Sequence, residues 1–145
     1  MSSATGDAAV LVKFHAQKVF LDENDFCTVV TFDTTRREYL NLQRAHPPVP
    51  DEETGVVPPD DQVYLERLGQ ACAARGGVEA CQLSRTGLRL QVSEATASQL
   101  RGASEFEIAF KVGKAKFARL RALLRNVFRG VPGYQEVGAE PGGCT

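Results

Sequence analysis

Apolar and polar residues alternate along much of the chain, which is the pattern of β-strands that bury one face. The alternating runs lie at residues 10–17, 26–32, 38–44, 78–84, 87–92 and 105–110, and a further short structured segment is expected at 62–68. In the third run, Leu40 and Leu42 share one face, and Tyr39, Asn41 and Gln43 lie on the other. Because parallel sheets rarely leave one face polar, the runs predict antiparallel pairing.

Two segments follow the periodicity of a helix instead. Ser93 is suited to cap a short helix over residues 94–101, and Gly102 is typical of the position after a helix. A longer amphipathic helix is predicted over 114–128, with Phe117, Leu120, Leu124, Val127 and Phe128 on one face. The predicted fold class is therefore α+β: an antiparallel sheet of about six or seven strands with the C-terminal helix packed on one face.

Two segments contain many residues that disfavour regular structure. Residues 45–61 hold five of the seven prolines together with five acids and no base. Proline has no amide donor, so this segment is predicted to be a long loop. Residues 131–145 are rich in glycine and are predicted to be a disordered tail. A single domain is expected over residues 8–130.

Charge is distributed unevenly, although the chain of 145 residues has a net charge of only -1. Residues 1–66 contain twelve acids and five bases, whereas residues 111–129 contain seven bases and no acid. We predict that the loop acids face solvent and supply the electrostatics of partner binding. These acids are Asp51, Glu52, Glu53, Asp60 and Asp61.

Composition is that of an ordinary globular protein, with 43% hydrophobic and 24% charged residues. No apolar run is long enough to span a membrane, and the N-terminus lacks the basic start and apolar stretch of a signal peptide. We therefore expect a soluble, cytoplasmic protein that does not bind membranes. Its oligomeric state does not follow from the sequence.

A search for catalytic motifs finds no nucleophile elbow, phosphate-binding loop or zinc-protease motif. The two histidines, His15 and His46, are expected to be solvated. The cysteines are Cys27, Cys72, Cys81 and Cys144, and their spacing does not match a zinc site. They are expected to be free thiols, with Cys27 and Cys81 buried in strands. We therefore expect no enzyme activity, no cofactor and no metal ion.

The basic residues of the C-terminal helix have two possible roles. Lys114, Arg121, Arg125 and Arg129 follow one flank of its apolar stripe. They could bind phosphate groups, or they could border the acidic part of the same fold. The aromatic residues of this helix belong to its apolar stripe and not to its polar face, so base stacking is not available there. The second role is favoured, and nucleic acid is not the expected partner.

Several ordered runs of residues form a set: Asn24 to Val29, Tyr39 to Arg44, Tyr64 to Glu66, Gly76 to Val78, Leu83 to Arg85 with Leu88, and Phe106 to Phe110 followed by the C-terminal helix. Together these runs resemble the immunity protein 10 family of bacterial polymorphic toxin systems. Their order and spacing agree over residues 14–129. The chain departs from the family at the turn 33–37, which ends in two bases, at Arg75, where members carry an aromatic residue, and in the proline-rich segment.

The resemblance implies an α+β protein that binds and neutralises a cognate toxin domain without catalysis. Many toxin domains of such systems are basic nucleases, which the acidic loop would complement. The alternatives are a general interaction or scaffold domain without a toxin partner, and a small nucleic-acid-binding domain that uses the basic helix.

Six positions carry much of this resemblance. Gln43, Arg44, Tyr64 and Glu66 could contact the toxin or could form hydrogen bonds between strands. Gly76 and Gly77 are expected to be structural, because glycine allows tight backbone geometry. The candidate partner-binding residues are therefore the five loop acids together with Gln43, Arg44, Tyr64 and Glu66.

Overall fold

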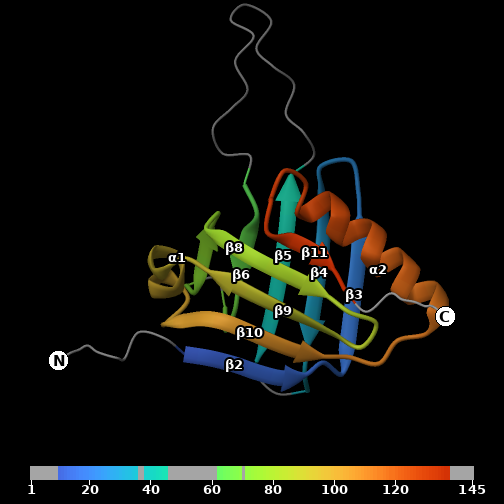
Figure 1. Ribbon diagram of the computed structural model, residues 1–145, viewed down its shortest axis with the longest axis horizontal. Helices are drawn as coiled ribbons and strands as arrows, with labels where there is room; N and C mark the ends of the chain where they lie inside the picture. Colours follow the sequence, from blue (N-terminus) through green and yellow to red (C-terminus); the bar gives the residue numbers. More distant parts are fainter. Residues whose placement is uncertain (1–9, 36–37, 46–61, 70, 138–145) are drawn as a thin grey trace, which may run out of the picture.

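Two five-stranded sheets make up most of the computed structural model, which describes residues 10–35, 38–45, 62–69 and 71–137. The first sheet has the order β11-β8-β9-β10-β2 and the second has the order β3-β4-β5-β6-β7 (Figure 1). The strands are β2 (Val10–His15), β3 (Lys18–Glu23), β4 (Cys27–Asp33), β5 (Tyr39–Ala45), β6 (Tyr64–Glu66), β7 (Ala73–Arg75), β8 (Val78–Leu83), β9 (Gly87–Val92), β10 (Ala103–Ala109) and β11 (Tyr134–Glu136). The helices are α1 (Glu94–Gln99) and α2 (Lys114–Val127).

The single sheet predicted from the sequence is wrong, because the chain changes sheets between two adjacent residues. The backbone N–H of Ala16 donates to Ala109 O in the first sheet. The N–H of the next residue, Gln17, donates to Asp33 O in the second sheet. The alternation of the first run therefore ends at a crossover, and β3 begins at Lys18 as a separate strand. Periodicity shows which face of a strand is buried, but it does not show which strand is the neighbour.

Two strand pairs are parallel, which corrects the prediction of a purely antiparallel sheet. β2 pairs in parallel with β10, and β11 pairs in parallel with β8. β8 and β9, which correspond to the predicted runs 78–84 and 87–92, do form an antiparallel pair. The short helix is also present as predicted: Ser93 caps α1 and accepts a hydrogen bond from the backbone N–H of Thr96.

The strand β11 lies in the segment that the sequence assigns to a disordered tail, so that assignment does not hold for residues 131–137. Gly133 brings this segment close to β8, since a Cβ at that position would lie 2.1 Å from Glu79 O. The Tyr134 ring then stacks on Phe128 at a centroid distance of 5.3 Å. A three-residue strand has too few positions to show a periodic pattern. Residues 138–145 lie outside the described residues.

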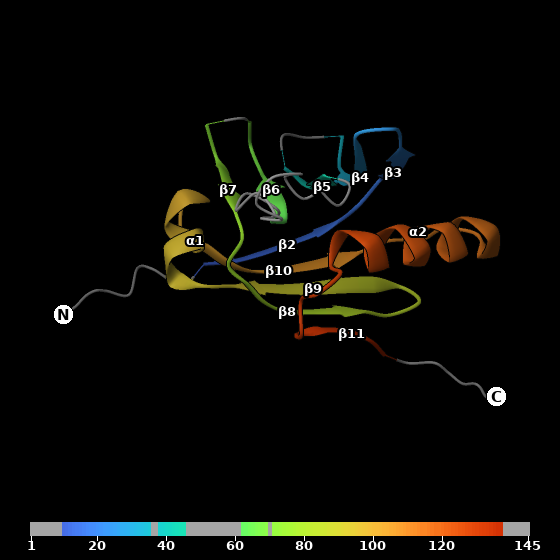
Figure 2. The ribbon, with the colours of Figure 1, turned by 90° about the horizontal axis from the view of Figure 1, so that it is seen from above.

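The inner faces of both sheets share one hydrophobic core with α2. Leu120 and Leu124 of this helix are fully buried, and α2 contacts β3, β4 and β5. Figure 2 shows α2 between strands of the two sheets on one side of the molecule, with α1 on the other side. The core includes apolar residues of the predicted run 105–110 and of the predicted C-terminal helix: Phe106, Ile108, Phe110, Leu120, Leu124 and Phe128. The prediction of one domain over residues 8–130 stays a prediction.

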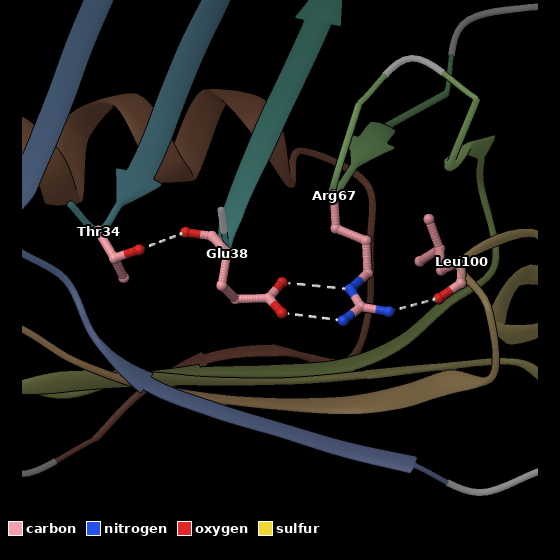
Figure 3. Close-up of polar contacts among 4 residues, drawn as sticks. All are labelled: Thr34, Glu38, Arg67 and Leu100. Atoms are coloured by element: carbon pink, nitrogen blue, oxygen red, sulfur yellow. Dashed lines mark hydrogen bonds and ion pairs between the residues drawn. The ribbon is translucent and has the colours of Figure 1, made fainter. Parts of the chain in front are cut away.

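A buried arginine joins the two layers near α1 (Figure 3). The Nη2 and Nε atoms of Arg67 donate to the carboxylate of Glu38 at 2.9 and 3.3 Å. Its Nη1 atom donates to Leu100 O, at the C-terminal end of α1, at 3.0 Å. Glu38 is held in turn through its backbone carbonyl, which accepts from Thr34 Oγ1 at 2.9 Å. The guanidinium of Arg67 is thus ion-paired with Glu38 and also hydrogen-bonded to the C-terminal end of α1.

Candidate protein-binding surface

The second sheet turns a polar, tyrosine-bearing face away from the core. Along β4, β5 and β6, fully buried residues alternate with half-buried ones. The half-buried positions of neighbouring strands lie opposite one another: Gln43 pairs with Tyr64, and Asn41 pairs with Glu66. We refer to this surface as the tyrosine face. It consists of Thr31, Tyr39, Asn41, Gln43, Tyr64 and Glu66.

The carboxylate of Glu66 holds the hydroxyl groups of two tyrosines. Tyr39 donates to Oε2 at 2.5 Å and Tyr64 donates to Oε1 at 2.6 Å. Burial, together with the hydrogen bond to Glu66, raises the pKa of Tyr39 to about 12, and the same causes raise the pKa of Tyr64 to about 12. Both hydroxyl groups therefore remain protonated donors at neutral pH. The Arg75 guanidinium lies over the Tyr64 ring at 5.4 Å from its centroid.

Amides and a hydroxyl continue this network across β4 and β5. Gln43 Nε2 donates to Asn41 Oδ1 at 2.9 Å, and Asn41 Nδ2 donates to Thr31 Oγ1 at 2.9 Å. These side chains are held in place before any partner arrives, so little conformational entropy remains to be lost on binding. Tyrosine is enriched in protein interfaces because it combines a large apolar ring with a polar tip. The arrangement is typical of a recognition surface.

Among the residues that the sequence singles out, Gln43, Tyr64 and Glu66 come together on this face, whereas Arg44 does not. Arg44 is only 8% exposed and lies on the opposite side of β5. Its Nη1 atom donates to Val127 O at 2.9 Å and to Arg129 O at 3.2 Å, at the C-terminal end of α2. These contacts favour the structural interpretation of Arg44 over direct contact with a partner.

Gly76 and Gly77 form a tight turn between β7 and β8. Their φ angles are +77° and +81°, a region that side chains disfavour. A Cβ at Gly77 would lie 1.9 Å from Thr96 Oγ1. The same hydroxyl donates to Gly76 O at 3.0 Å, so the turn is bound to α1. The turn thus has no room for a larger residue at Gly77.

The five loop acids Asp51, Glu52, Glu53, Asp60 and Asp61 lie outside the described residues. The described chain leaves the second sheet at Ala45, the last residue of β5, and resumes at Gln62, just before β6. The acidic segment therefore joins the two strands whose residues Gln43 and Tyr64 lie opposite each other. By covalent continuity, both ends of this segment are attached beside the tyrosine face.

The arginines on the flank of α2 have contacts within the fold. The Nε and Nη2 atoms of Arg125 each donate to the Glu136 carboxylate of β11 at 2.7 Å. Arg129 Nη2 donates to Ala45 O at 2.8 Å, and the Arg121 guanidinium lies 5.9 Å from the centroid of the Phe117 ring. Arg125 and Arg129 thus have partners within the fold, although Glu136 lies outside residues 1–66, the acidic part that the basic residues were expected to border.

Cysteine and histidine occupy positions unlike those of catalytic groups. Cys81 is fully buried in β8, and burial raises the pKa of its thiol far above the usual range, so the thiol stays protonated. Cys72 is buried and free, whereas Cys27, expected to be buried, is free but only half-buried. His15 is exposed on β2. His46 and Cys144 lie outside the described residues.

Two further observations apply to the described part of the chain. It contains no group of three or more histidine, cysteine, aspartate or glutamate side chains placed to hold a metal ion. Within the same residues, none of the helices has the length and apolar character needed to cross a membrane.

Some residues of the tyrosine face were missed by the sequence analysis. Strand alternation places Tyr39 and Asn41 on the same face of β5 as Gln43, but neither was proposed as a contact residue. Thr31 could not be found in this way, because its position beside Asn41 depends on the register between β4 and β5. Arg67 could not be found either, since its partners Glu38 and Leu100 are far away along the chain.

These observations define a class of protein: an α+β protein of two sheets around one core, with a hydrogen-bonded sheet face as its candidate site. The family model for Immunity protein 10 matches residues 15–118, well over half of the chain. The chain therefore belongs to the immunity protein 10 family. No curated protein and no solved structure matches it.

Proposed function

We propose that this chain is an immunity protein that binds and neutralises a cognate toxin domain of a bacterial polymorphic toxin system. In this proposal it acts in the cytoplasm of the toxin-producing cell, by binding alone and without catalysing a reaction. The observation that carries the proposal is the family match over residues 15–118. The buried, protonated thiol of Cys81 and the preorganised tyrosine face agree with a binding role.

The proposed contact surface combines the tyrosine face with the acidic segment attached beside it. Gln43, Tyr64 and Glu66 would lie at its centre, and the five loop acids would lie at its edge. Acidic groups at the edge of an interface mainly accelerate association with a basic partner. A basic toxin domain, such as a nuclease, fits this arrangement. Arg44 would support the surface from the core side through its contacts with α2.

Co-expression with the protein encoded immediately upstream of this chain tests the proposed function, because the proposal predicts that this neighbour is the toxin. Wild-type protein should restore growth of cells that make the toxin, and the two chains should co-purify. A variant that does not fold, Leu124→Asp, serves as the negative control. Absence of both rescue and co-purification with wild-type protein would favour a scaffold domain without a toxin partner. Salt-dependent retention on nucleic acid in place of toxin binding would favour the basic helix as the site.

A matched pair of variants tests which face makes the contact. Gln43→Arg adds a bulky positive charge to the tyrosine face, whereas Gln82→Arg adds the same group to an exposed position on β8 of the first sheet. We expect Gln43→Arg to raise the Kd for a basic toxin by about tenfold or more, since an unfavourable charge at an interface costs a few kcal/mol. Gln82→Arg should change it by less than about threefold. The opposite ranking would move the site to the first sheet.

A further inference from the structure

The most exposed large hydrophobic residue in the described chain is Phe26, in the turn between β3 and β4. Its exposed fraction is 80%, compared with 51% for Leu11 on β2 and 56% for Phe20 on β3. Single exposed apolar residues are common on proteins and need no special explanation. Phe26 differs from such residues in the rigidity and the charge of its surroundings.

Asn24 fixes the turn that presents Phe26. Its Oδ1 atom accepts from the backbone N–H of Phe26 at 2.7 Å and from that of Cys27 at 3.0 Å. The backbone N–H of Asn24 donates to Cys27 O at 3.1 Å, and its Nδ2 atom donates to Asp22 Oδ2 at 3.2 Å. Both the turn and the direction of its backbone are therefore set in the free protein. Because the backbone of the turn is fixed, it loses little conformational entropy when a partner covers Phe26.

The C-terminal end of α2 braces the base of this turn. Asn126 Nδ2 donates to the hydroxyl of Thr28 and, at 3.4 Å, to Glu23 Oε2. Thr28 Oγ1 in turn donates to the same Glu23 oxygen at 3.3 Å. Glu23 and Thr28 are the last cross-strand pair of β3 and β4 before the turn. The turn is thus attached to the core helix and not only to its own two strands.

The surroundings of Phe26 are acidic. Asp22, Glu23 and Asp25 precede it, and residues 19–35 contain no lysine, arginine or histidine. Cys27 lies opposite Ala45, so the turn and the point where the described chain leaves β5 are at the same end of the second sheet (Figure 1). The acidic segment that follows Ala45 therefore starts beside the turn. This end of the sheet combines one large apolar group with a concentration of negative charge.

We propose that Phe26 is the apolar anchor of the partner interface and that it fits an apolar pocket on a toxin domain whose rim carries lysine or arginine side chains. This inference rests on the proposed function and adds the contact point and the chemistry of the partner surface. An apolar side chain of this size contributes most when the complex covers it fully. The surrounding acids would exclude partners with an acidic rim.

Affinity measurements on single variants test the anchor, with the toxin domain encoded upstream as the probe. Phe26→Ala should weaken binding about thirtyfold, the loss that marks an interface hot spot. Leu11→Ala, which also truncates an exposed apolar side chain but on the first sheet, should weaken binding by less than about threefold. Asp25→Asn should slow association a few-fold at low salt, whereas Glu79→Gln on β8 should leave the association rate unchanged.

The outcomes separate this inference from the proposed function. If wild-type protein protects cells and binds the toxin while Phe26→Ala binds as tightly as Leu11→Ala, the anchor is wrong and the immunity function stands. If wild-type protein neither protects nor binds, the proposed function fails and the anchor fails with it. A melting temperature of Phe26→Ala clearly below that of wild type would give Phe26 an internal role and overturn the inference. A concentration-dependent dimer that Phe26→Ala abolishes would also overturn it, because the occupant would be a second copy of this chain.

Discussion

Buried and exposed residues alternate along the strands of both sheets, but the outer faces of the two sheets carry different kinds of side chain. On the first sheet, Arg89 binds Glu105 at 3.0 Å and Glu107 at 3.6 Å, and Lys13 binds Glu107 at 3.6 Å. The side chains of Lys13 and Arg89 are 72% and 56% exposed, so these ion pairs are hydrated. On the second sheet, one carboxylate, Glu66, is surrounded by neutral donors that are half-buried.

This difference indicates which of the two faces a partner can cover at a lower cost in desolvation free energy. Hydrated ion pairs must lose their water when they are covered, and their mutual attraction often does not repay that loss. The hydroxyl groups of the tyrosine face already have protein partners, and the rings add apolar area. The first sheet also has a hollow of about 480 Å³, but Lys13, Arg89 and Glu107, which form these ion pairs, are among the residues that line it. We therefore expect a partner to cover the tyrosine face in preference to the first sheet.

The largest effect is expected where both sheets meet α2. Leu124 is fully buried between them, so Leu124→Asp places an unpaired charge in the shared core. We expect a loss of more than about 4 kcal/mol, which would unfold the protein or make it insoluble. Ala122→Asp, on the exposed side of the same helix, should leave a folded protein. Chemical denaturation followed by circular dichroism checks both variants. A cooperatively folded Leu124→Asp protein would contradict the shared core.

The next-largest loss of stability is expected when a buried arginine of the second sheet is replaced, in comparison with an exposed arginine of the first sheet. Arg44→Ala removes a buried guanidinium and leaves the carbonyl groups of Val127 and Arg129 without that donor, at a cost of about 2–3 kcal/mol. Arg89→Ala removes exposed ion pairs and should cost less than about 1 kcal/mol. Urea unfolding of the two variants measures the difference directly. Equal losses would show that Arg44 contributes no more than a surface ion pair.

A smaller effect concerns stability at alkaline pH. The folded state raises the pKa of Tyr39 and Tyr64 from about 10 to about 12. Between these values the folded protein keeps protons that the unfolded chain has lost, so the free energy of unfolding falls as pH rises from 10 to 12. Below pH 10 the contribution is fully present. In the double variant Tyr39→Phe/Tyr64→Phe, the free energy of unfolding should fall less steeply with pH. Near pH 11, the difference in bound protons between the folded and unfolded states should be smaller by about one to two.

Urea midpoints at several pH values measure this slope. Tyr134 contributes equally to both proteins, because burial raises its pKa in β11 as well. Parallel pH profiles for wild type and the double variant would show that Glu66 and burial do not hold the two hydroxyl groups as described.

The smallest effect on folding is expected from the acidic segment. Neutralising Asp51, Glu52, Glu53, Asp60 and Asp61 should leave stability nearly unchanged and slow association with a basic toxin, chiefly at low salt. A control neutralises Lys114, Lys116 and Arg119, which are exposed on α2. Stopped-flow association at two salt concentrations compares the three proteins. Slower association of the control alone would assign the electrostatics to the helix and indicate an acidic partner.

Local rules in the sequence were sufficient for most of the individual elements. Alternation predicted β4, β5, β8, β9 and β10, because a strand with one buried face must place apolar residues at every second position. Ser93 and Gly102 predicted the limits of α1 through backbone capping, which involves only neighbouring residues. The buried face of α2 followed from its helical spacing. Family membership could also be inferred, since ordered runs of residues carry it.

The arrangement of these elements was decided only in the tertiary structure. Three features depend on contacts between distant segments: the change of sheets at Ala16 and Gln17, the parallel addition of β11, and the hydrogen bonds of Arg44 to the end of α2. Glu66 binds Tyr39 across 27 residues of chain, and the register of β5 and β6 brings them together. A pattern along one strand shows which side chains leave the core, because burial is a property of that strand and its face. It does not show which other strand supplies their partners, because register is a property of two strands packed on a common core.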